Sequence, residues 1–431
     1  MEAILSSQSV DTDVLSPSLK YGLPASGSWC LGKREATVYA LGSSYSPSGV
    51  KMISVPFGST SEWLVPESVV FSANFNPVGG TCFPASPDAN VLFERIDIRL
   101  GGQLVESVTE SNRVNELFTR LTMSPQKKVN LAQMGFGTQI PTTEPDWSSA
   151  QNHEAGVVAA SKRIHWKCNV SGLLTQHLWI PLYALSGMGL VVNLFLAPGA
   201  ESLIASTDGA AYVQDYTLTD VKALCTMCTI SDQLMESFQG QLLNGTALRI
   251  PIKKVESMWS YIPNNIPSKF SIPMSRTYTR LCSLFASFVQ EPNPATPKLK
   301  LCNQFYTHTA SAETLEYSLQ MGTRRVPDNN VVGFSESWMR LLNCIGIGNS
   351  LSHSTGISFA DYATNSFAVG IDTEKIPHLA STGENLSGTS TIFLNLNGFG
   401  TTAADLPSRC QLCAQYDAVI EIRDSTTEIF E

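Results

Sequence analysis

The sequence predicts an all-β protein built from two related domains. Most apolar segments alternate with polar residues at a period of two, as half-buried strands do, and few segments show the helical period. A strand, a glycine turn and an amphipathic helix also occur twice along the 431 residues, which indicates a duplicated unit. The chain length suits two or three domains of ordinary size.

Charged residues are sparse in this chain. Lys and Arg together number 28 and Asp and Glu 37, which gives 15% charged residues and a net charge of −9, whereas an ordinary soluble protein has about 25%. This composition excludes a charge-rich disordered chain. Adjacent basic residues never extend beyond a pair, and neutralising nucleic-acid phosphates requires basic clusters, so we expect no direct nucleic-acid binding.

The first residues predict a protein that is made inside a cell. Residues 1–6 lack a basic start followed by an apolar core, so no secretory signal is predicted and the ten cysteines are expected to be reduced. Residues 178–200 carry no charge over a membrane-spanning length. Pro181, Pro198 and a turn signal at residues 186–189 interrupt this stretch, which predicts two buried strands around a turn.

Individual elements follow from the two periodicities. The clearest strands are expected within residues 69–75, 96–100, 298–301, 317–321 and 418–422. Apolar residues at helical spacing predict helices at residues 108–121 and 334–345 and a weaker one that begins near Ser231. Ser107 and Glu110 are expected to form a capping box at the start of the first helix.

The repeat fixes how these elements are grouped. Residues 96–101 align with residues 317–322 at an offset of 221, and the helices that follow them align at the same offset. Farther along, residues 192–194 match residues 394–396 at an offset of 202. The smaller offset indicates an insertion in the first half, which we expect to be a long exposed loop at about residues 123–161.

We therefore expect an N-terminal arm at residues 1–40, a first domain at 41–240 and a second at 241–431. The connection is expected within residues 240–273, which are rich in Pro and Asn. Each domain is expected to end on an alternating strand, near residues 216–226 and 416–423. About eight strands can form a sandwich or a closed barrel, and periodicity alone does not separate the two.

Several segments resemble one protein family. Residues 96–106, with the helical residues 115–118 that follow, resemble the strand, Gly-Gly-Gln turn and helix in the first jelly roll of double jelly-roll major capsid proteins from double-stranded DNA viruses. Residues 178–182 and 189–194 are similar to the paired strands after the family's long first-domain loop, residues 241–252 to the start of the second roll, and residues 416–422 to its end. The resemblance covers about residues 45–431 and is closest to capsid proteins of Polinton-like viruses, adintoviruses, virophages and larger eukaryotic DNA viruses. It implies two tandem eight-stranded jelly rolls with a few short helices.

The same resemblance implies a structural role in a virion. In such proteins three copies form a capsomer with a near-hexagonal outline, and these capsomers tile an icosahedral shell. The implied partners are other copies of the chain, neighbouring capsomers, and penton and minor capsid proteins, with assembly inside the host cell. The loop at residues 123–161 would form a tower or clasp a neighbour, and residues 1–35 would run beneath the shell as a tether.

Two Cys-x-x-Cys pairs are the sharpest candidates for a metal site. A tetrahedral zinc site needs four thiolates that converge, and the chain offers Cys225 with Cys228 and Cys410 with Cys413. Each pair falls in or beside a predicted strand, where positions three apart face opposite sides of the sheet. We therefore expect these cysteines to be buried thiols and predict no metal site.

Other chemistry-bearing residues lack a supporting pattern. The six histidines show no metal-ligand spacing; they are His153, His165, His177, His308, His353 and His378. Ser335 and Ser350 lie in Gly-x-Ser-x sequences that lack the second glycine of a hydrolase elbow. We predict no catalytic or cofactor-binding residue and no enzymatic activity.

The tryptophans divide into two groups. Core packing is expected for Trp63, Trp166, Trp179, Trp259 and Trp338, which lie in apolar patterns. Trp29 and Trp147 lie in the arm and in the long loop, too far apart in sequence to suggest a shared binding platform. We expect each of these two to contact a neighbouring molecule.

Other functions remain open on sequence. An intracellular tandem β-sandwich that binds carbohydrate or hydrolyses glycosides would show paired carboxylates or clustered tryptophans in a cleft. A minor capsid or penton protein usually has a single jelly roll, so the duplication argues against it. A host-encoded relic of an integrated viral element is a further alternative.

Overall fold

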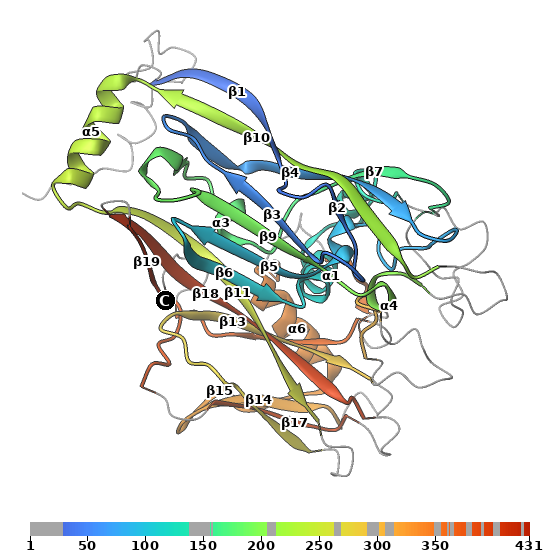
Figure 1. Ribbon diagram of the computed structural model, residues 1–431. Coiled ribbons are helices and arrows are strands. Elements are labelled where there is room, and N and C mark those ends of the chain that lie inside the picture. Colours follow the sequence, from blue (N-terminus) through green and yellow to red (C-terminus); the bar gives the residue numbers. More distant parts are fainter. Residues whose placement is uncertain are drawn as a thin grey trace, which may run out of the picture.

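Four antiparallel β-sheets form the framework of the protein. The computed structural model describes residues 29–137, 156, 158–204, 213–262, 269–290, 301–306, 314–348, 355–359, 362, 366–375, 382–388, 392–399, 406–423 and 426–431. Figure 1 shows the sheets stacked one above another, with the first half of the chain above the second. Strands before residue 231 form two of the sheets, and strands after residue 247 form the other two.

The first half contributes an outer and an inner sheet. The outer sheet has the order β1 (Cys30–Tyr39), β10 (Tyr216–Ile230), β4 (Trp63–Pro77) and β7 (Lys162–Trp166), with β2 (Ser44–Tyr45) on β10 and β8 (Ile180–Pro181) on β4. The inner sheet has the order β3 (Met52–Phe57), β9 (Leu190–Leu196), β5 (Phe93–Leu100) and β6 (Gln103–Thr109). Phe93 of the inner sheet lies 4.9 Å from Trp166 of the outer sheet between ring centres, so the two sheets share an apolar core.

The second half repeats this arrangement. One sheet has the order β11 (Leu248–Tyr261), β18 (Arg409–Arg423), β13 (Leu281–Val289) and β16 (Ala368–Asp372), with β19 (Thr426–Phe430) on β18. The other has the order β12 (Phe270–Pro273), β17 (Ile392–Asn397), β14 (Glu316–Met321) and β15 (Arg324–Val332). Phe399 contacts Phe270 of one sheet and Phe288 of the other, with ring centres 5.3 and 4.7 Å apart.

The two halves correspond strand for strand. The order β11-β18-β13-β16 repeats β1-β10-β4-β7, and β12-β17-β14-β15 repeats β3-β9-β5-β6, in the same chain order. Eight strands in two sheets with this connectivity form a jelly roll, so the chain is a double jelly roll, and the predicted fold class is confirmed. The aligned turn residues Gly101 and Gly322 both have left-handed backbone, with φ of +57° and +60°, which favours glycine.

Short helices fill the connections. Equivalent hairpins precede α1 (Ser111–Thr122) and α6 (Gly333–Ile345), and α5 (Asp232–Leu243) joins the two rolls and protrudes from the stack in Figure 1. The others are α2 (Pro125–Ala132), α3 (Gly172–Thr175), α4 (Gly199–Ser202) and the 3-10 turns η2 (Ala89–Leu92) and η3 (Leu182–Ala184). Within the described ranges, no helix is long and apolar enough to cross a membrane.

Strand β1 corrects the predicted arm. Residues 30–39, assigned to an irregular arm that ended at residue 40, pair along β10 from Cys30 to Tyr39. Only Ala36 in this strand is buried, so the strand lacks the apolar alternation by which a strand is recognised in sequence. Residues 1–28 lie outside the described residues.

Strand β11 corrects the predicted connection. Residues 248–261, within the expected connection at 240–273, form a strand that pairs with β18 over its whole length. Because β11 lies at the edge of its sheet, Pro251 is tolerated there without the loss of a ladder hydrogen bond. The rolls are joined instead through α5 and residues 244–247.

The capping box at the first helix is also wrong. Ser107 lies in β6, where its hydroxyl donates to Asp97 at 2.8 Å. The helix begins only at Ser111, and Glu110 before it has left-handed backbone and makes no side-chain cap. Pairing with β5 extends the strand through Thr109, so the hairpin overrides the local helix signal.

The long loop at residues 123–161 is partly structured. Residues 125–132 form α2, which Ser124 caps through the backbone N–H of Lys127, and Phe136 is buried. Residues 138–155 lie outside the described residues. The strand expected at 298–301 also lies mostly outside them, and Leu301 is a buried turn residue.

Candidate functional site

The structure separates the two cysteine pairs that were candidates for a metal site. Cys225 and Cys228 lie in β10, Cys410 and Cys413 lie in β18 of the other roll, and all four are buried. Burial raises the pKa of Cys413 to about 12, which is unsuited to a thiolate ligand at neutral pH. Across the described part of the chain, no group of three or more His, Cys, Asp and Glu side chains could hold a metal ion.

The remaining sequence candidates are scattered. His165 lies in β7, and the exposed His177 contacts Glu67 through Nδ1 at 2.5 Å. Ser335 lies on the exposed side of α6. Outside the described residues lie His153, His308, His353, His378, Ser350 and Trp147.

Polar side chains gather instead where the two rolls meet, a region that we call the seam. Helix α1 belongs to the first roll, and its buried polar residues are Ser111, Asn112, Arg113, Asn115, Glu116 and Thr119. Ser111 and Asn115 bond within the first roll, to the Phe93 carbonyl and to Asp88, whereas the arginines of the helix face the second. Phe118 of the same helix packs edge-on against Phe285 of β13, with ring centres 5.2 Å apart. The helix therefore serves as packing surface for the second roll as well as its own.

Two arginines of α1 reach across the seam. Arg120 donates to the carbonyl of Asn303 at 2.7 Å and to Ser366 Oγ at 3.1 Å, and its guanidinium lies 5.0 Å from the ring centre of Phe305. Arg113 donates to the carbonyl of Gln304 at 3.3 Å. The fork of donors on a guanidinium can satisfy several carbonyls from one fixed position, so these residues hold the second roll in a set orientation.

A buried carboxyl group supports the seam from the first roll. Glu106 of β6 accepts from Ser171 Oγ at 2.5 Å and from the backbone N–H of Leu173 at 3.1 Å. Burial raises the pKa of Glu106, against the opposing effects of Ser171 and Lys254. These bonds position α3, and a Cβ added at its Gly172 would lie 2.2 Å from the carbonyl oxygen of Lys253. The backbones of α3 and β11 therefore touch, which only glycine permits.

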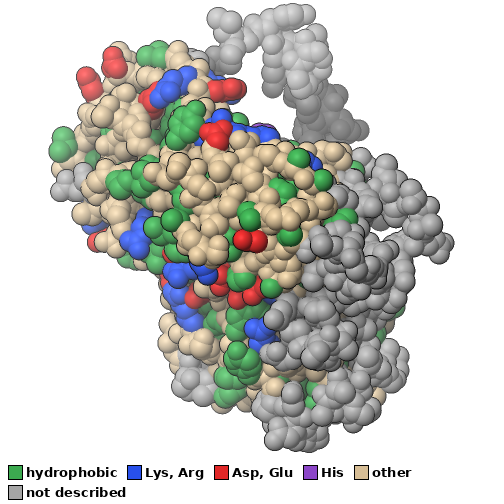
Figure 2. Space-filling model, turned by 45° about the vertical axis from the view of Figure 1, so that its right-hand side comes forward, with side chains coloured by type: hydrophobic (Ala, Val, Ile, Leu, Met, Phe, Trp, Pro, Cys, Tyr) green, Lys and Arg blue, Asp and Glu red, His purple; other side chains and the backbone are tan. Residues whose placement is uncertain are grey.

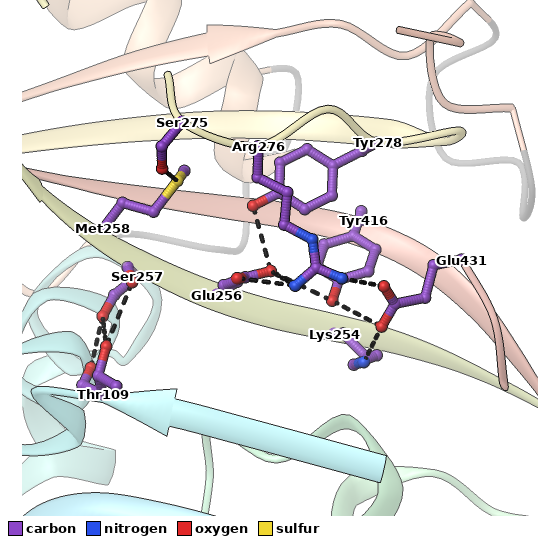
Figure 3. Close-up of polar contacts among 10 residues, drawn as sticks. All are labelled: Thr109, Lys254, Glu256, Ser257, Met258, Ser275, Arg276, Tyr278, Tyr416 and Glu431. Carbon is purple, nitrogen blue, oxygen red and sulfur yellow. Dashed lines mark hydrogen bonds and ion pairs between the residues drawn. The ribbon is translucent and has the colours of Figure 1, made fainter. Parts of the chain in front are cut away.

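Figure 3 shows the polar contacts along β11 at the seam. Thr109 Oγ1 lies 3.0 Å from Ser257 Oγ, and the Ser257 hydroxyl also donates to the carbonyl of Thr109. On the other side of the strand, Arg276 binds Glu256 through contacts of 2.8 and 2.9 Å and also binds Glu431, which Lys254 binds as well. This second group fastens the end of β19 onto β11.

A cavity of about 550 Å³ lies beside these contacts. It is bounded by α1, β11, β13, β16, β18 and the end of α6, and its charged lining residues are Lys253, Asp372, Glu374 and Asp417. Lys253 pairs with Glu374 at 3.1 Å. The aromatic residues that line the cavity are Phe118 and Phe285, which pack against each other.

A second hollow, the apolar groove, lies between α5 and the end of the outer sheet. Its volume is about 510 Å³, and it is lined by Trp29, Cys30, Trp63, Leu178, Trp179, Pro181, Ile230, Leu234, Phe238, Leu248, Arg249 and Ile250. No residue of α5 is buried, although Phe238 packs against Trp63 with ring centres 5.3 Å apart.

The groove revises the interpretation of the tryptophans. Trp63 and Trp166 are buried, as expected, whereas Trp179, Trp259 and Trp338 are only half-buried. Trp29 is 51% exposed and shares the groove with Trp63 and Trp179. Sequence spacing gave no signal for this grouping, because the three residues come from separate segments.

The surface itself carries few charges. On the face shown in Figure 2, Lys, Arg, Asp and Glu side chains gather near the waist and the top, and uncharged atoms cover most of the rest. Large apolar residues are exposed at several positions, among them Leu31, Leu41, Val50, Leu178, Leu243 and Tyr261.

Comparison with known proteins gives structural likeness only. No sequence-family profile and no curated protein matches the chain. It is similar to the PBCV-1 virus capsid structure with a TM-score of 0.64 and 12% identity, over 94% of this chain and 98% of that one. The Faustovirus major capsid protein gives 0.63 and 8% over 96% and 93% of the two chains, and the mavirus major capsid protein gives 0.52 and 9% over 100% and 95%.

Proposed function

We propose that this chain is a major capsid protein whose trimers form pseudo-hexagonal capsomers of an icosahedral virion shell. The observation that carries this proposal is the strand-for-strand duplication, together with likeness to capsid proteins over nearly the full length of both chains. Three copies of a chain with two equivalent rolls present six similar corners around a threefold axis. A near-hexagonal tile follows from that symmetry.

The contacts at the seam support this geometry, because they fix the relative orientation of the two rolls. A tile has six matching corners only if the two rolls of every copy keep the same relative orientation. Arg113 and Arg120 bind backbone carbonyls of the second roll, and the contact at Gly172 leaves no room for sliding. Rigid elements of this kind position an interface without an ordering cost at assembly.

Sparse charge supports contacts between copies. The core of a protein–protein interface is depleted of charged residues, which suits a chain with 15% charged residues, and the exposed apolar residues offer area for burial. We further propose contacts with neighbouring capsomers and with penton and minor capsid proteins, assembly inside the host cell, and no direct nucleic-acid binding or enzymatic activity. The division into two domains near residue 240 is part of the same proposal, with β1 counted in the first roll.

Imaging of the purified protein tests this function. The expressed chain would be fractionated by size and the main peak examined by negative-stain electron microscopy. We expect particles with a near-hexagonal outline and threefold symmetry. Separate single particles with two lobes, stable at high protein concentration and able to bind glycans on an array, would contradict the proposal and favour the carbohydrate-binding alternative.

A further inference from the structure

Two cysteines meet at the rim of the apolar groove. Cys30 is the first residue of β1 and faces Ile230 across the ladder, and Cys228 lies two residues before Ile230 on β10. The ladder is bulged between Cys30 and Gly32, and a bulge re-aims the side chains beside it. The two cysteines are therefore diagonal neighbours at the end of the sheet.

The strand register places the two side chains on the same face of the sheet, because Cys30 is opposite Ile230 and Cys228 lies two residues before Ile230. Burial raises the pKa of Cys228, and the charge of Cys30 and a hydrogen bond with its side chain raise it further. Cys228 is buried, whereas Cys30 is partly exposed and lines the groove. A reagent in solution can thus reach the Cys30 thiol, and the buried Cys228 is its diagonal neighbour on the next strand.

The strand end that carries Cys30 is weakly held by side chains. Ala36 is buried and Val38 packs against the core, but both lie in the second half of β1. The end near Cys30 depends on the backbone ladder and on the ion pair of Arg34 with Glu62, at 2.5 Å. An exposed ion pair contributes little. A covalent bond at Cys30 would fix the point where the chain enters the sheet.

We propose that Cys30 and Cys228 form a disulfide when the protein meets a small-molecule disulfide such as oxidised glutathione. The Cys30 thiolate attacks one sulfur of the oxidant, whose S–S bond breaks, and the released glutathione thiolate takes up a proton. Cys228 then loses its proton to solvent and attacks the Cys30 sulfur, which releases the second glutathione. The protein loses two electrons, and one oxidised glutathione becomes two reduced molecules.

The other cysteine pairs lack this arrangement. Cys410 and Cys413 lie three residues apart on one strand, so their side chains point to opposite faces and cannot be bridged without backbone movement. Cys225 is opposite Ala36 and is buried in the core. The inference does not depend on the proposed capsid function.

Counting thiols tests the proposal. The reduced, folded chain would be incubated with oxidised glutathione, then denatured, labelled with N-ethylmaleimide and weighed. We expect the oxidised protein to take up two labels fewer than its ten cysteines allow, and peptide mapping to join Cys30 to Cys228. Cys30→Ser and Cys228→Ser should each abolish this loss, whereas Cys225→Ser, a matched change on the same strand, should retain it.

Three results would overturn the proposal. These are uptake of the full number of labels, glutathione left on Cys30 with Cys228 still labelled, and a disulfide that joins Cys30 residues of two chains on a non-reducing gel. A second readout follows the backbone. Amide hydrogen exchange at residues 31–35 should slow on oxidation in the wild-type protein but not in Cys228→Ser.

Discussion

At the scale of single residues, burial decides how much an ion pair contributes. Arg120 and Glu116 are 11% and 2% exposed and lie 3.8 Å apart on α1, and Arg120 also binds the second roll. Arg34 and Glu62 make a shorter, bidentate pair at the surface, where the two side chains are 59% and 14% exposed. Removing one partner of a buried pair strands the other charge, whereas solvent screens an exposed pair.

We therefore predict that Arg120→Ala lowers the free energy of unfolding by about 3 kcal/mol. Arg34→Ala is the matched control and should cost at most about 1 kcal/mol. Urea unfolding followed by tryptophan fluorescence measures both. Equal losses in the two variants would show that Arg120 does not hold the seam.

The contacts of Glu431 predict a pH dependence. Burial acts to raise its pKa, but hydrogen bonding with Lys254 and the charges of Lys254 and Arg276 outweigh burial and lower it. A carboxyl group whose pKa is lower in the folded state stabilises the protein above its ordinary value near 4.5, and this contribution is lost as the pH falls through the lowered pKa.

Glu431→Gln should accordingly be less stable than the wild-type protein at pH 7, with the difference shrinking as the pH falls below about 4.5. Urea midpoints of both proteins at pH 7, 5 and 3 give the comparison. Glu62, whose pKa is lowered by Arg34, remains in both proteins and cancels. A difference that stays constant with pH would refute this role of Glu431.

At the scale of elements, the contact of α3 with β11 is the tightest approach between the rolls that we describe. Gly172→Ala places a methyl group against the Lys253 carbonyl, so the helix must shift, at a cost of about 1–3 kcal/mol. Gly240 is the matched control, because it has open space at its Cβ position and lies in α5. Gly102 also has open space, but its left-handed backbone would strain any side chain placed there.

Gly240→Ala should leave stability unchanged or raise it slightly, because alanine is the better helix former. Thermal unfolding by calorimetry distinguishes the two variants. We expect Gly172→Ala to lower the midpoint or to split the transition, because the rolls lose their fixed contact. An unchanged single transition would show that the seam tolerates movement at α3.

The sequence also predicts elements unevenly, for physical reasons. Strands such as β5 and β14 bury one face, so their alternation is visible, and the repeat identified them as equivalents. Strand β1 buries one side chain, so it lacks that signal and backbone pairing defines it. Strand β11 does alternate at Ile250, Ile252 and Lys254, but Pro251 and a buried lysine make this pattern hard to recognise in sequence.

The seam was missed for a related reason. The polar residues of α1 fit an amphipathic surface helix in sequence, yet Arg113, Asn115 and Glu116 are buried. Arg113 binds Gln304 of the second roll, and Asn115 donates to Asp88 of the first. Likewise, Trp29, Trp63 and Trp179 meet at the groove only through the tertiary fold. Contacts between distant segments leave no local pattern from which they could be predicted.

At the scale of the whole molecule, the proposed capsomer requires that two equivalent rolls per chain combine with a threefold axis. Under the proposed function, two equivalent rolls held together at the seam would make each chain one third of a six-cornered tile. This relation requires three copies in each particle, and other numbers do not produce six similar corners.

The mass of the assembled particle in solution therefore tests the central claim most directly. Native mass spectrometry of the purified chain at micromolar concentration should give a species of three times 46.7 kDa. A monomer or a dimer as the dominant species, unchanged on concentration, would contradict the account.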